Sequence, residues 1–205
     1  MVRKMKHIGF LLFVALSISP ARAQMLSPAD LDTAKVYTSM EGAMKYPELV
    51  LRLDLSKQKL GSIPDDVFLL NNLQELRMDK CRLSELPDGF NALPLLQSLR
   101  LQHNEIDSIP PTIFGLKHLR ILDVADNIVE CIPDEIDQLT SLETLAIWDN
   151  PITYYPERLT EMQQLKVLDV LNNAMSRETQ QRLKVGLPNC RIVMSPPCAC
   201  MDGGQ

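Results

Sequence analysis

Aromatic residues are scarce in this chain of 205 residues: they make up 5% of it and include a single Trp. Basic residues are not in excess either, since 21 Lys and Arg stand against 26 Asp and Glu, a formal charge of −5. A nucleic-acid-binding surface is usually basic, and its aromatic side chains often stack on bases. The composition therefore argues against a nucleic-acid partner.

Cysteine is also sparse, because five Cys residues are too few for a disulfide scaffold. We expect Cys81 and Cys131 to be buried thiols and Cys190 to be packed in a terminal cap. Cys198 and Cys200 remain open: they could form a disulfide within the chain, link two copies, or hold a soft metal. Two thiols without a nearby His are a weak metal signal.

Catalytic motifs are absent: the sequence has no phosphate-binding loop, no H-E-x-x-H and no nucleophile elbow. Only His103 and His118 follow the first 23 residues. One His on an open surface lacks the pocket that catalysis needs. The sequence thus predicts a protein that is not an enzyme and has neither a cofactor nor a bound metal ion.

Residues 1–23 have the pattern of a secretory signal peptide. Basic residues precede an uncharged apolar run over residues 8–18, and Ala21-Arg22-Ala23 offers the small residues that a signal peptidase reads. The run is too short to span a bilayer, which takes roughly twenty residues. We expect cleavage before Gln24, a secreted or periplasmic protein and no membrane span. Without residues 1–23, 17 Lys and Arg face 26 acids, a net charge of −9.

A period of 23 residues runs through the middle of the chain. Repeats counted from Val50 stay in register to residue 175 without an insertion or deletion. Positions one, four, six and eleven are apolar in all six repeats. Position four is Leu53, Leu76, Leu99, Leu122, Leu145 and Leu168.

Each repeat also predicts a local structure. Positions four and six lie two residues apart, so both side chains point to one face of a short strand. A single strand cannot bury that face, but stacked repeats build a parallel sheet with a continuous core behind it. Position nine is Asn in the last four repeats, namely Asn104, Asn127, Asn150 and Asn173. Their amides are expected to form a structural ladder that bonds the turns of neighbouring coils.

The complete pattern is L-x-x-L-x-L-x-x-N-x-L followed by I-P-x-x-I-x-x-L. It is similar to the leucine-rich repeat family, and the chain resembles the short secreted bacterial members. The resemblance implies an α/β solenoid with a parallel sheet on its concave face and short helices or turns on its convex face.

Both ends of a solenoid need caps. Residues 24–49 are expected to form a helical cap before the six repeats of residues 50–175, with a helix over residues 39–46 that Pro47 ends. Residues 176–194 are expected to form the second cap, a helix begun by Ser176 and a strand over residues 191–194. Residues 195–205 are expected to be a flexible tail that contains Cys198 and Cys200.

Positions three, five and seven point away from the core, onto the inner curve of the predicted coil. In the first three repeats they carry opposite charges that face each other across rungs, such as Arg52 and Glu75 or Arg100 and Asp123. A charged ligand could still use Arg77, Arg100 and His103.

The last three repeats are apolar on this face, around the single Trp. Their residues are Ile121, Ala125, Ala146, Trp148, Val167 and Leu171. An exposed apolar surface with an aromatic anchor is typical of a protein contact. Trp148 could instead pack on its own neighbours or under the C-terminal tail.

The sequence therefore predicts an exported, non-catalytic module that binds a protein or peptide on its concave face. Two alternatives stay open. One is a structural or assembly protein that self-associates through its caps or through a disulfide of its tail cysteines. The other is a small metal-binding or hydrolytic protein that uses the tail thiols.

Overall fold

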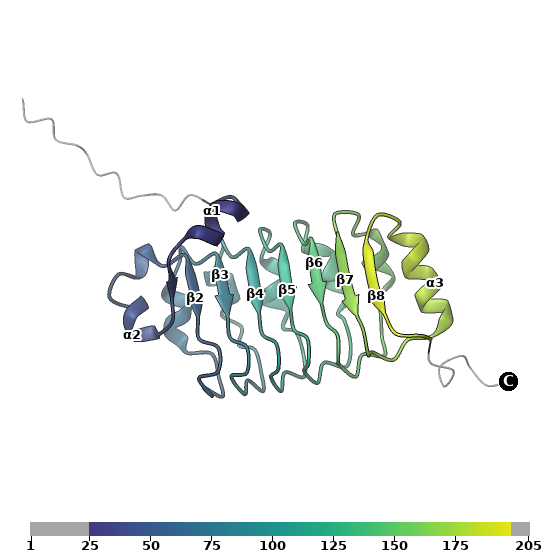
Figure 1. Ribbon diagram of the computed structural model, residues 1–205, viewed down its shortest axis with the longest axis horizontal. Helices are drawn as coiled ribbons and strands as arrows, with labels where there is room; N and C mark the ends of the chain where they lie inside the picture. The colour runs from purple at the N-terminus through teal and green to yellow at the C-terminus, as the bar shows by residue number, and fades with distance from the viewer. Residues whose placement is uncertain (1–24, 198–205) are drawn as a thin grey trace, which may run out of the picture.

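The computed structural model describes residues 25–197 (Figure 1). Eight parallel strands form one sheet in strict chain order, from β1 to β8. The strands stand side by side along the long axis, with α2 at one end, α3 at the other, and α1 over the edge of the sheet near β3 (Figure 1). The predicted leucine-rich repeat solenoid is confirmed.

The six repeats contribute one short strand each. These strands are β2 (Arg52–Asp54), β3 (Glu75–Arg77), β4 (Ser98–Arg100), β5 (Ile121–Asp123), β6 (Thr144–Ala146) and β7 (Val167–Val170). The return segments contain single 3-10 turns rather than α-helices. They are η2 (Asp65–Leu69), η3 (Phe90–Ala92), η4 (Pro111–Gly115), η5 (Asp134–Gln138) and η6 (Glu157–Glu161).

The leucines of position four form the spine of the core. Each pairs with its counterpart on the next strand, as Leu53 does with Leu76 and Leu99 with Leu122. All six are at most 1% exposed. The apolar residues of positions one and six are buried as well, and at position eleven only Leu60 is half-buried instead of buried. One sheet face is therefore covered along the whole length of the solenoid.

The asparagines of position nine join neighbouring coils. The Asn127 amide donates to the carbonyls of Leu101 (3.0 Å), Val124 (2.9 Å) and Ala125 (3.0 Å). Its Oδ1 accepts the backbone N–H of Ile106 at 3.0 Å. Asn104, Asn150 and Asn173 make equivalent bonds. Each amide thus satisfies polar backbone groups that the turn would otherwise leave buried without partners.

The first two repeats close this turn differently. In repeat two the Cys81 thiol takes the place of the amide, and it donates to the Leu55 carbonyl at 3.1 Å. Burial raises the pKa of this thiol, which keeps it protonated and able to donate. In repeat one the Gln58 amide reaches back to the Thr38 carbonyl of the N-terminal segment at 2.8 Å.

The N-terminal segment contains more structure than the sequence pattern predicts. It comprises α1 (Pro28–Thr33), β1 (Val36–Tyr37), α2 (Met40–Ala43) and the 3-10 turn η1 (Pro47–Leu49). Helix α2 falls within the helix expected over residues 39–46, and Ser39 Oγ accepts the Gly42 N–H at 3.1 Å. Helix α1 and strand β1 were not predicted. Strand β1 pairs with β2 and adds a rung before the first repeat.

At the other end lie α3 (Arg177–Gly186) and β8 (Arg191–Met194). Ser176 Oγ accepts the Thr179 N–H at 3.1 Å and begins the helix. Strand β8 continues the sheet beside β7.

The expectation that Cys131 is a buried thiol is wrong, because Cys131 is exposed. It lies in a return segment, where its backbone forms an isolated parallel β-bridge with Tyr154. The expected signal peptide, Cys198 and Cys200 lie outside the described residues.

Candidate functional site on the sheet face

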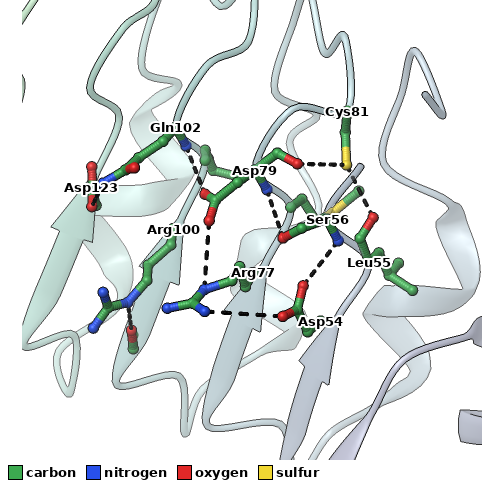
Figure 2. Close-up of polar contacts among 12 residues, drawn as sticks. Asp54, Leu55, Ser56, Arg77, Asp79, Cys81, Arg100, Gln102 and Asp123 are labelled. Atoms are coloured by element: carbon green, nitrogen blue, oxygen red, sulfur yellow. Dashed lines mark hydrogen bonds and ion pairs between the residues drawn. The ribbon is translucent and has the colours of Figure 1, made fainter. Parts of the chain in front are cut away.

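The outward face of the sheet, formed by positions three, five and seven, is charged over the first strands. Arg52 Nε donates to Glu75 at 2.8 Å across the β2–β3 rung. The Arg77 guanidinium lies between Asp54 (4.0 Å) and Asp79 (3.5 Å), as Figure 2 shows. The Arg52–Glu75 and Arg77–Asp54 pairs join residues on adjacent rungs, as expected, whereas Asp79 belongs to the same repeat as Arg77. The Arg77–Asp54 pair is close to solvent, and such a pair stabilises the fold by only about 0–1 kcal/mol.

Arg100 and Asp123 do not form the expected pair. Asp123 is 5% exposed and accepts hydrogen bonds from the Gln102 amide and from the Ala125 N–H. Arg100 Nε instead contacts Ser98 Oγ at 3.4 Å. Within residues 25–197 no carboxylate lies within ion-pair distance of Arg100. Arg100 still acts on Asp123 through its charge, but it has no close ion-pair partner among the described residues.

Burial raises the pKa of the Asp123 carboxyl, although the Gln102 and Ala125 hydrogen bonds oppose the rise. A carboxyl whose pKa is higher in the folded state costs stability above that pKa, and the cost fades as the pH falls toward the unfolded value. We expect Asp123→Asn to raise the free energy of unfolding at pH 7, because a neutral amide avoids the cost of a buried charge. Urea denaturation at pH 7 and pH 4 measures the gain, which should shrink at pH 4. Loss of stability at pH 7 would contradict this account.

Trp148 is held in place by a contact that spans two rungs. Its ring meets the His103 ring edge-to-face with centroids 5.9 Å apart. His103 Nδ1 in turn hydrogen-bonds the Asp126 carboxylate. The repeat between the two rings carries Ala125, whose carbonyl accepts the His103 N–H at 3.1 Å. The side chain of Trp148 is thus half-buried and oriented.

Ala125 was expected on the exposed apolar surface, and this expectation is wrong. It is 0% exposed, because His103 and Trp148 on the flanking repeats come together over its small side chain. The other five residues stay accessible. Ile121, Ala146, Trp148 and Val167 are half-buried, and Leu171 is 38% exposed. These five residues are called the apolar zone below.

The N-terminal segment makes a second feature, which the sequence pattern did not reveal. The Leu26 N–H donates to Gln74 Oε1 at 2.9 Å, and the Gln97 amide donates to the Leu26 carbonyl at 2.9 Å. Arg52 Nη1 donates to the Asp32 carbonyl at 2.7 Å. These bonds fasten α1 beside the starts of β2 to β4. The two neutral amides at position two, Gln74 and Gln97, are the only sequence signal for this contact.

A groove of about 220 Å³ lies between α1 and the sheet. Leu31, Ile121 and Thr144 line it together with Arg100, so it is continuous with the apolar zone. At its far side Glu143 binds Arg120 (2.8 Å) and Lys166 (2.9 Å). Burial opposes ionisation of Glu143, but hydrogen bonds from Lys166 and Arg120 prevail and lower its pKa. The groove therefore combines two apolar side chains, Leu31 and Ile121, with a mixed charged rim that includes Arg100.

Residues 25–197 offer neither a metal-ligating cluster nor a membrane-spanning helix. No group of three or more His, Cys, Asp or Glu is placed there to hold a metal ion. Nor does that part of the chain contain a helix of the length and apolarity that crossing a bilayer requires. Cys81, Cys131 and Cys190 are free thiols, so these described cysteines give disulfide-linked self-association no support.

Comparison with known proteins agrees with this architecture. A family model described as a leucine-rich repeat region matches residues 48–192. No curated protein sequence matches the chain.

Among solved structures, internalin C2 of Listeria monocytogenes is similar, with 22% identity and a TM-score of 0.61 over 73% of this chain and 64% of that one. A second Listeria monocytogenes internalin, inlF, has 17% identity and a TM-score of 0.60 over 82% of this chain and 55% of that one.

The ectodomain of the Arabidopsis thaliana receptor kinase GASSHO1/SCHENGEN3, solved in complex with CASPARIAN STRIP INTEGRITY FACTOR 2, is also similar. It has 21% identity and a TM-score of 0.56 over 72% of this chain and 21% of that one. The chain thus spans less than two thirds of the length of each of these proteins. At such identities the likeness concerns the fold.

Proposed function

The chain belongs to the leucine-rich repeat family, and we propose that it is an exported, non-catalytic module that binds a protein or peptide on its sheet face. The apolar zone would supply the contact area, with Trp148 as the anchor. Arg100, Arg77 and His103 would orient the ligand. The cleavable pattern in residues 1–23 supports export.

One observation carries this proposal: Trp148 is oriented by its neighbours while its apolar surroundings stay accessible. The His103 ring and Asp126 fix the orientation of the indole before any ligand arrives. A side chain that is already ordered loses little conformational entropy on binding. Aromatic anchors of this kind commonly supply much of the binding energy of a protein interface.

The size of the face limits the affinity. The eight strands of the sheet, at a spacing of about 4.8 Å, span only about 34 Å. A ligand confined to this ribbon buries a small area, and small interfaces are usually weak or transient. The groove beside α1 extends the surface, because Ile121 and Arg100 border it. A ligand that enters the groove would gain contacts with Leu31 and Thr144.

The receptor ectodomain that resembles this chain was solved in a complex with another factor, which supports a binding role for the fold. The absence of catalytic motifs supports a role without catalysis. Self-association is the competing role, and its sequence signals, Cys198 and Cys200, lie outside the described residues.

Replacement of Trp148 by Ala should abolish capture of a partner identified with the wild-type protein as bait. We expect affinity to fall at least tenfold, as titration calorimetry would measure, while the free energy of unfolding changes by less than about 1.5 kcal/mol. Tyr46→Ala is the matched control, since Tyr46 is an aromatic residue 60% exposed on the N-terminal cap. A collapse in stability would show that Trp148 serves the core, and unchanged capture would refute the proposed site.

A further inference from the structure

Four basic residues form a compact exposed cluster in the turns that follow β2 and β3. Lys57 and Lys59 lie in the first turn, and Lys80 and Arg82 occupy the same positions one repeat later. We call these four residues the basic ridge. All four are exposed, and within residues 25–197 none of them forms an ion pair with a carboxylate. The ridge is a concentration of free positive charge in an acidic protein.

Backbone geometry does not account for these residue types. Lys57, Lys59, Lys80 and Arg82 all have positive φ, at 67°, 52°, 59° and 61°. Asn and Asp tolerate this left-handed region best, whereas Lys and Arg have no short polar side chain to bond locally. The later repeats place Asp126, Asp149 and Asn172 at the position of Lys57. The fold alone would therefore favour Asn or Asp over Lys here.

Neighbouring rungs lie about 5 Å apart, so the equivalent cations of the two turns also repel each other. Unfavourable backbone conformation and like-charge repulsion at the same four residues point to a role outside folding.

The ridge borders a shallow hollow on the sheet face. Lys57, Lys80, Arg77 and His103 line this hollow, which measures about 300 Å³. Its two carboxylates already have partners. Asp54 accepts the Ser56 N–H and Asp79 accepts the Gln102 N–H, both at 2.9 Å, and Arg77 lies between the two acids (Figure 2). The ammonium groups of Lys57 and Lys80 are left to face an incoming anion.

We propose that the basic ridge binds an extended, carboxylate-rich segment of a protein partner. Each of the two turns presents two separate cations. This spacing suits several carboxylates spread along an extended peptide better than it suits one compact anion. A binding site for a single phosphate usually contains several backbone N–H groups that point at the anion. Here the N–H groups of Lys57 and Lys80 already donate to the carbonyls of Asp79 (2.8 Å) and Gln102 (2.9 Å).

The ridge lies on the first two repeats and Trp148 on the fifth, although His103 both lines the hollow and contacts the Trp148 ring. Its test uses a fluorescein-labelled peptide of about ten residues that alternates Glu and Ser. Anisotropy at about 20 mM salt should show binding that weakens as salt is added. A Gln-Ser peptide should not bind.

The decisive variant is Lys57→Asn with Lys80→Asn, since Asn suits the left-handed backbone. We expect the peptide Kd to rise about tenfold while the melting temperature stays constant or increases. Lys45→Gln with Lys184→Gln removes the same charge from exposed sites elsewhere and should leave the Kd within twofold. Leu171→Ala, which alters the apolar zone at a residue that does not line the hollow, should also bind the peptide normally.

Three results would overturn the proposal. An equal loss of peptide affinity in the two double variants would show that binding depends only on the net charge of the protein. Loss of peptide binding in Leu171→Ala would show that the peptide binds the apolar zone instead. Capture of labelled polyphosphate without capture of the Glu-Ser peptide would assign the ridge to a phosphate polymer instead.

Discussion

Replacement of Leu122 by Ala is expected to lower the free energy of unfolding by about 3–5 kcal/mol, the largest effect of any single substitution proposed for this protein. Leu122 is 0% exposed and lies at the centre of the spine, where it pairs with Leu99 on one side and Leu145 on the other. Truncation removes contacts to both neighbours and leaves a cavity that the rigid coils cannot close. Urea denaturation followed by far-ultraviolet circular dichroism measures the loss.

Leu171→Ala provides the comparison, because it removes the same atoms from a side chain that is 38% exposed on the sheet face. We expect a loss below about 1 kcal/mol there. If the two substitutions cost the same, the spine would not be the main source of stability.

Asn127→Ala should cost about 2–4 kcal/mol. Asn127 is 6% exposed, and its amide satisfies three carbonyls on two coils while its Oδ1 accepts one N–H. Removal leaves those backbone groups buried without partners, and each such group costs about 1–3 kcal/mol unless water enters. Thermal unfolding would detect a markedly lower melting temperature.

Asn71→Ala is the matched control, since Asn71 is exposed in a return segment. Its melting temperature should stay near that of the wild type. Asn127→Asp is a second informative variant, because a carboxylate can replace Oδ1 but cannot donate to the three carbonyls. A mild effect of Asn127→Asp would mean that the amide donors matter less than the geometry indicates.

The repeat itself could be predicted from sequence because its physical requirements are local and periodic. A strand with leucines two residues apart can bury them only by stacking, and identical spacing brings Leu53, Leu76 and the later spine residues into one register. The Ser176 cap was equally readable, since a helix start needs an acceptor for its first N–H groups. In these elements the local preference and the final fold agree.

The finer details of the site depend on contacts between repeats, which a periodic pattern does not contain. Ala125 occupies an outward position, yet the rings of His103 and Trp148 meet over it. Asp123 faces Arg100 on the adjacent strand but takes the Gln102 amide as its partner. The position of helix α1 could not be read from the periodic pattern, because it depends on single hydrogen bonds from Leu26 to Gln74 and Gln97, which do not repeat along the chain.

The attachment of Leu26 has a consequence for the order in which the molecule assembles. Bonds between adjacent coils, such as those of Asn127, join residues 21 to 26 apart, so each coil can form on the one before it. The bond from Gln97 to Leu26 spans 71 residues and needs three coils already in place. Helix α1 should therefore dock late in folding and connect the first three coils. It should also be the first part to detach, which would widen the groove while the coils beneath it remain intact.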